Sequence, residues 1–65
     1  MTIYEAIQLI KQIGFSARPV PGTSSYMIET PEGKISWLKE KAMLQLVSSL
    51  KDNPNHLKAA LNEIL

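Results

Sequence analysis

A glycine followed by three hydroxyl residues, Gly22-Thr23-Ser24-Ser25, is the segment of this chain that could most readily bind or attack a substrate. Glycine-rich loops bind phosphate through backbone N–H groups, and a serine becomes a nucleophile when a base and an orienting acid accompany it. A phosphate loop also needs further glycines, a lysine and a following helix. The run "PGTSSYM" has one glycine and no lysine, and it leads into a strand pattern. We predict that this segment is a turn.

Other reactive side chains do not form a recognisable catalytic or metal-binding set. His56 is the only histidine, and the chain has no cysteine, so a zinc site would have to consist almost wholly of carboxylates. No serine is accompanied by a visible base and acid, and Glu29 and Glu32 flank a turn where water keeps a carboxylate ionised. We expect no cofactor, no metal and no enzymatic activity.

A small basic cluster around the single tryptophan is the clearest candidate for binding. Its members are Arg18, Lys34, Trp37, Lys39 and Lys41. If a helix begins near Ser36, its dipole disfavours the lysines of its first turns by about 0.3–1 kcal/mol each. The cluster is then either a site for phosphate or for an acidic partner surface, or a set of lysines that only solvates the rim of the fold. Trp37 could stack on a base, fill a pocket in a partner protein, or serve as the core anchor between sheet and helix.

The N-terminal segment has the signals of one helix. Thr2 and Glu5 have the Thr-x-x-Glu spacing of a capping box. Apolar residues then recur on one helical stripe at Ile3, Ala6, Ile7, Ile10 and Ile13. We predict a helix that ends at about Ile13 in a Schellman-type stop, with Gly14 closing it and Phe15 packing back on Ile10.

The middle of the chain alternates with the period of strands. Residues 15–19 can form only an edge strand, because Pro19 and Pro21 cannot donate to a ladder. The run "SYMIET" is the clearest strand, with Met27 and Glu29 on the face opposite Tyr26, Ile28 and Thr30. "TPEGK" predicts a type I turn with a glycine bulge that leads into a strand at "KISW".

The C-terminal half returns to helical spacing. The run "SWLKEKAMLQLVSSLK" predicts a second helix that covers the sheet. A third helix follows, with Asn53 as its N-cap and Pro54 in its first turn. The predicted fold is therefore α+β, with a helix, two or three antiparallel strands and two C-terminal helices, in one domain spanning residues 1–65.

The succession of "YEAIQLIKQIGF", a strand, a Gly-Thr/Ser loop, a strand, a Pro-x-Gly hairpin and a long helix resembles the HicA family of small toxin ribonucleases, over roughly residues 3–50. The resemblance implies a fold like that of the double-stranded-RNA-binding domain. In that family a catalytic histidine follows a Gly-Ser pair in the loop. Here the matching residues are Gly22, Thr23, Ser24 and Ser25, and the histidine is missing.

The composition is that of an ordinary globular chain, and its small size makes association with itself or with a partner plausible. With 45% hydrophobic residues, 20% charged residues and a net charge of +1, the chain is neither disordered nor strongly basic. No apolar run could span a membrane, and the N-terminus does not resemble a secretory signal, so we expect a cytoplasmic protein without a membrane partner. The first hypothesis is a non-catalytic protein-interaction module, homodimeric, acting as an accessory or inhibitor protein.

We expect that dimer to form partly through the third helix, with Leu57, Leu61 and Ile64 at the interface, because the first two helices already cover a small sheet. Further apolar surface would come from Leu9, Met27, Met43, Leu44 and Leu65. The alternative is a small nucleic-acid-binding protein that uses the basic cluster around Trp37. A HicA-like ribonuclease relative without its catalytic histidine is the third hypothesis.

Overall fold

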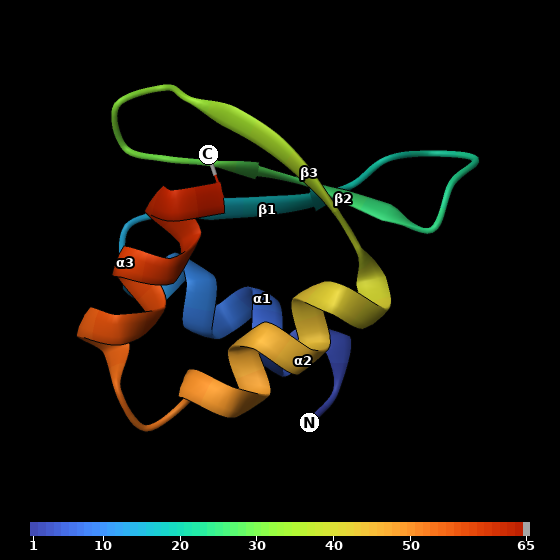
Figure 1. Ribbon diagram of the computed structural model, residues 1–65. Helices are drawn as coiled ribbons and strands as arrows, with labels where there is room; N and C mark the ends of the chain where they lie inside the picture. Colours follow the sequence, from blue (N-terminus) through green and yellow to red (C-terminus); the bar gives the residue numbers. More distant parts are fainter. Residues whose placement is uncertain (65) are drawn as a thin grey trace.

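The computed structural model describes residues 1–64, which form three helices and three strands in the order αβββαα (Figure 1). The elements are α1 (Ile3–Gln12), β1 (Ser16–Pro19), β2 (Ser25–Glu29), β3 (Ile35–Lys39), α2 (Glu40–Leu50) and α3 (Pro54–Ile64). The predicted α+β class, with a helix, an antiparallel sheet and two C-terminal helices, is confirmed. Leu65 lies outside the described residues.

The sheet has the order β1-β2-β3, and both pairs of strands are antiparallel. The three helices lie together on one side of it (Figure 1). On β2, Ile28 points to the helices and is buried, while Met27 and Glu29 point the other way and are half-buried. The fold therefore has two layers, with one face of the sheet covered by helices and the other uncovered.

Helix α1 is held at both ends by the predicted caps. The Thr2 hydroxyl accepts a bond from the Glu5 N–H at 3.1 Å, and the Glu5 carboxylate accepts one from the Thr2 N–H at 2.9 Å. The bond from Thr2 N–H favours the ionised carboxylate, so it lowers the pKa of Glu5. At the other end, Gly14 N–H donates to Lys11 O and Phe15 N–H donates to Ile10 O, which is the Schellman pattern.

The loop at Gly22-Thr23-Ser24-Ser25 is a turn, as predicted. Thr23 N–H donates to Val20 O at 3.2 Å, and the Thr23 hydroxyl donates to the same oxygen at 2.9 Å. The Thr23 hydroxyl also accepts a bond from Ser25 N–H at 3.1 Å. Because Thr23 and Ser25 already use their N–H groups inside the turn, these donors are not available to bind a phosphate.

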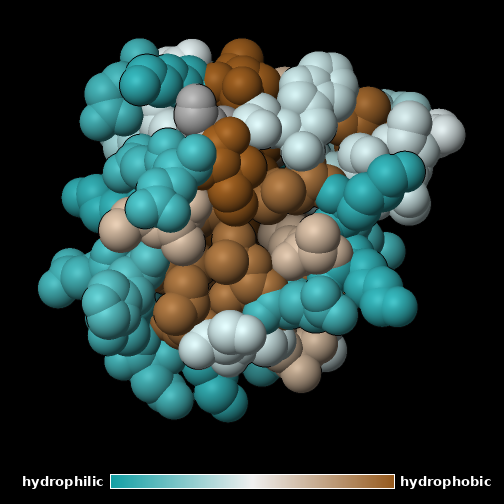
Figure 2. All heavy atoms as spheres, in the orientation of Figure 1, coloured by the Kyte–Doolittle hydropathy of each residue, from teal (hydrophilic) through white to brown (hydrophobic). Residues whose placement is uncertain are grey.

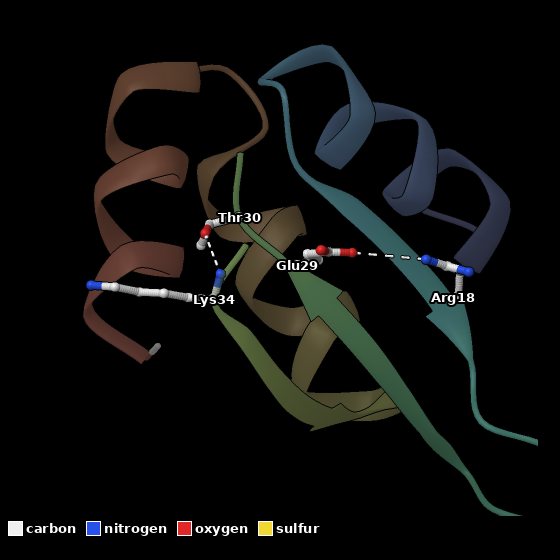
Figure 3. A network of polar contacts seen from close by, with 4 residues as sticks. All are labelled: Arg18, Glu29, Thr30 and Lys34. Carbon is white, nitrogen blue, oxygen red and sulfur yellow. Dashed lines mark hydrogen bonds and ion pairs between the residues drawn. The ribbon is translucent and has the colours of Figure 1, made fainter. Parts of the chain in front are cut away.

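The hairpin between β2 and β3 is closed by the predicted turn. Gly33 N–H donates to Thr30 O at 3.0 Å, and Thr30 N–H donates to Lys34 O at 2.9 Å. The buried Thr30 hydroxyl accepts a further bond from Lys34 N–H at 3.0 Å (Figure 3). Gly33 has φ +95°, in the left-handed region that residues with a Cβ avoid.

The boundary between the last strand and the second helix differs from the prediction. The sequence pattern suggested a helix from near Ser36, but β3 continues to Lys39 and α2 begins at Glu40. Strand β3 pairs with β2 over its whole length, and Glu40 N–H then donates to Ser24 O at 2.8 Å. The pairing with β2 outweighs the helical pattern, so Trp37 lies in a strand and Lys39 precedes the helix.

The core lies between the sheet and the helices, and α3 contributes to it. Its buried apolar residues are Ala6, Ile10, Phe15, Ala17, Ile28, Met43, Val47, Leu57 and Leu61. The prediction that Leu57 and Leu61 form a dimer interface is wrong, because they are only 2% and 1% exposed within the monomer. Met43, predicted to be surplus apolar surface, is likewise buried. Helix α3 packs against α2 and adds Leu57 and Leu61 to this core.

Helix α3 begins as predicted. The Asn53 side-chain oxygen accepts a bond from His56 N–H at 3.2 Å, and the Asn53 amide nitrogen lies 2.9 Å from His56 Nδ1. His56 is therefore an exposed residue of the first turn, bonded to the helix cap. Of the helices within residues 1–64, none is long and apolar enough to cross a membrane.

Replacing Gly33 tests the turn between β2 and β3. We expect Gly33→Val to lower the free energy of unfolding by about 1–2 kcal/mol, because valine must adopt a positive φ. An added Cβ meets no atom within 4 Å, so the loss would come from the backbone alone. Glu32→Val, in the same turn without a positive φ, is the control and should change stability by less than about 0.5 kcal/mol. Equal urea midpoints for the two variants would contradict the turn geometry.

Candidate functional site

The uncovered face of the sheet is the candidate functional site, and we call it the open sheet face. Directly paired residues of antiparallel strands point to the same side, so the register assigns each side chain to a face. The open sheet face consists of Ser16, Arg18, Ser25, Met27, Glu29, Ile35, Trp37 and Lys39. The opposite side chains of the same strands, such as Ala17 and Ile28, are buried against the helices.

One row of side chains crosses the middle of this face. Arg18 of β1 is paired with Met27 of β2, and Met27 is paired with Trp37 of β3. Bonds at Thr30–Lys34 and Ser24–Glu40 place Met27 and Trp37 in a non-hydrogen-bonded pair, where side chains approach most closely. The row therefore aligns Arg18, Met27 and Trp37 across the three strands.

Two large apolar side chains on this face are exposed to solvent. Trp37 is 59% exposed and Ile35 is 52% exposed, although both belong to a fully paired strand. The interpretation of Trp37 as the core anchor between sheet and helix is wrong, because its strand position turns the indole away from all three helices. Tyr26 and Leu38, the pair next to it, occupy the helix side instead.

The charges on the open sheet face are mixed. Arg18 and Glu29 lie diagonally across β1 and β2 and form an ion pair at 3.8 Å (Figure 3). Their side chains are 68% and 35% exposed, and an exposed pair of this kind contributes at most about 1 kcal/mol. Lys39, the last residue of β3, adds a second positive charge. The face is apolar at its centre and charged at its margins.

The sheet brings together only part of the predicted basic cluster. Arg18, Trp37 and Lys39 share the open sheet face. Lys34 lies at the end of the hairpin, and its side chain extends toward α3, away from Arg18 (Figure 3). Lys41 is exposed on α2. The five residues therefore do not form one patch.

Sequence reasoning missed several members of the open sheet face, Ser16 among them. Ile35 was not assigned to any site, and Glu29 was considered only as a solvent-exposed carboxylate beside a turn. The alternation of "ISWLK" carries the missing signal, because Ile35, Trp37 and Lys39 occupy every second position. The helical pattern assigned to the same residues concealed it.

A second apolar surface lies on the helix side. Figure 2 shows an apolar strip running between α3 and α2, with hydrophilic side chains along both margins. On these helices Leu44, Leu46, Leu50 and Ala60 are half-buried, and Ile64 is 43% exposed. These side chains pack against the core cluster or continue it, so this strip is the outer part of the monomer's own core.

The helix side also has a shallow hollow beside the N-terminal part of α1. It is lined by Met1, Tyr4, Glu5, Gln8, Leu9, Lys51 and Asp52. Glu5 is already bonded in the helix cap, so it is not free to act on a ligand. Within residues 1–64 the acidic and histidine side chains form no cluster of three that could hold a metal ion. The open sheet face is therefore the stronger candidate.

Comparisons of this chain with protein-family models, with curated proteins and with solved structures find no match. The resemblance to the HicA family stays a prediction. The inferences about function therefore depend on the geometry of the open sheet face.

Proposed function

We propose that this protein is a non-catalytic protein-interaction module, an accessory or inhibitor protein that contacts its partner through the open sheet face. The observation that supports this proposal is the exposure of Trp37, at 59%, at the end of the row that it forms with Met27 and Arg18. A tryptophan left on the surface of so small a domain adds apolar area in water without contributing a core contact. We expect the indole of Trp37 to become buried when a partner binds.

The composition of the face is that of a protein interface. Tryptophan, methionine and arginine are enriched at interface centres, and tryptophan and arginine are the most frequent hot-spot residues. The charged residues Glu29 and Lys39 lie toward the margins, where a polar rim remains hydrated. Trp37 is the side chain that a partner's pocket would enclose.

A single open sheet face is small. With strands about 4.8 Å apart and a rise of about 3.3 Å per residue, a three-stranded sheet of about five residues per strand covers roughly 14 Å by 17 Å. Stable interfaces bury about 800 Å² on each partner. The face alone therefore supports a transient contact, and a lasting complex needs additional surface next to it.

Removing the indole tests the proposed function. We expect Trp37→Ser to change the free energy of unfolding by less than about 0.5 kcal/mol, because the side chain is outside the core. The variant should lose proteins that immobilised wild type retains from its native host. Tyr4→Ser, at an exposed aromatic on α1, is the matched control and should retain them. The proposal fails if wild type and Trp37→Ser retain the same proteins.

A second candidate function is binding of single-stranded nucleic acid, favoured by the presence of Trp37, Arg18 and Lys39 on one face. Bases stack on exposed aromatic side chains, and flanking cations contact the backbone. We expect no retention on a single-stranded DNA or RNA column at 150 mM salt, because only two cations share the face with the indole. Retention that falls steeply with salt and is lost in Trp37→Ser would replace the first function with this one.

The protein should not cleave RNA. The motivation is the turn at residues 22–25, which lacks a histidine and uses the Thr23 and Ser25 N–H groups internally. RNA incubated with protein free of contaminating nucleases should stay intact on a denaturing gel. Cleavage that disappears in Ser24→Ala or Ser25→Ala, but persists in the control Ser49→Ala on α2, would contradict this expectation.

A further inference from the structure

The outer edge of β3 is a free strand edge. β3 is at the end of the sheet, so β2 is its one neighbouring strand among the described residues. Bonds at Thr30–Lys34 and at Ser24–Glu40 mark the hydrogen-bonded pairs of β2 and β3. By the antiparallel alternation, Ser36 and Leu38 direct their N–H and C=O groups to β2. Ile35, Trp37 and Lys39 therefore direct theirs outward, away from the sheet.

The opposite edge of the sheet is different. Val20 N–H donates to Ser25 O, so on β1 the residues that direct backbone groups outward are Ala17 and Pro19. Pro19 has no N–H, and proline at an edge prevents pairing with another strand. Strand β3 has no proline over its five residues. The sheet therefore has one edge blocked and one edge able to accept a strand.

We propose that a second copy of this chain pairs with that edge, β3 against β3 in antiparallel orientation, about a two-fold axis at Trp37. This inference rests on the proposed function and names the partner that completes the binding surface. The register follows from the three outward positions. An axis at Trp37 pairs Trp37 with its own copy and Ile35 with Lys39 of the second copy. In this register alone, the outward N–H and C=O groups of all three residues are hydrogen-bonded.

Charge complementarity supports this register. The same symmetry brings Lys34 of one copy next to Glu40 of the other, at each end of the paired strands. Lys39 is opposite Ile35, so like charges do not face each other across the two strands, which would be destabilising. Lys34, an exposed lysine that in a monomer would only discourage pairing, thus becomes a partner for Glu40.

The dimer also supplies the area that one open sheet face lacks. A continuous sheet of two copies doubles the face and places the two Trp37 side chains next to each other across the strand pair. Facing aromatic pairs on adjacent strands add to sheet stability. Because β1 is blocked by Pro19 in each copy, the assembly closes at two chains instead of extending into a fibre.

A charge exchange at the axis tests the dimer. The wild type should sediment at twice the 7.3 kDa chain mass at high micromolar concentration. Trp37→Lys and Trp37→Glu should each sediment as monomers, because like charges meet at the axis. An equimolar mixture of the two variants should return to the dimer mass, because lysine then meets glutamate. Tyr4→Lys, which adds the same charge on α1, is the control and should remain dimeric.

Hydrogen exchange gives an independent readout from the backbone. The amides of Ile35, Trp37 and Lys39 should become protected as the wild-type concentration rises, while those of Ser36 and Leu38 stay protected throughout. A wild-type monomer at high micromolar concentration, or a mixture of variants that stays monomeric, would overturn the dimer. If those results occurred while capture of partners still depended on Trp37, the dimer would be wrong and the proposed interaction function would stand.

Discussion

The antiparallel pairing of β2 with both of its neighbours is the constraint on which the rest of this structure depends. A shift of one residue in either pair would exchange the buried and open side chains of the whole sheet. Thr30 opposes that shift because its backbone bonds to Lys34 and Gly33 close the hairpin, and its buried hydroxyl holds Lys34 N–H. The turn thus determines that Ile28 enters the core and that Trp37 leaves it.

The single layer of helices explains why one face of the sheet is open. Helices α1 and α2 pack against one side of the sheet, α3 packs against α2, and Leu57 and Leu61 of α3 are part of the core that results. Among residues 1–64, no further element covers the second side. Trp37 and Ile35 on that side are therefore exposed to solvent.

The two edges of the sheet differ in their ability to pair with another strand. Pro19 and the Val20–Thr23 turn make the β1 edge unsuitable for pairing, whereas β3 has a regular, proline-free edge whose outward residues also project onto the open sheet face. Backbone hydrogen bonds and side-chain contacts can therefore act together at β3. Association through this edge and recognition through Trp37 would use one continuous surface.

The sequence by itself determined the features that depend on near neighbours in the chain. The capping box at Thr2, the stop at Gly14, the turn at Gly33 and the cap at Asn53 were all predicted, because each involves bonds between residues at most five positions apart. The class and order of the elements followed from these signals. Only the tertiary structure decided where β3 ends and which helices form the core. The segment around Trp37 fits both a strand and a helix, and pairing with β2 chooses between them, while the burial of Leu61 depends on how much space α1 and α2 leave beneath the sheet.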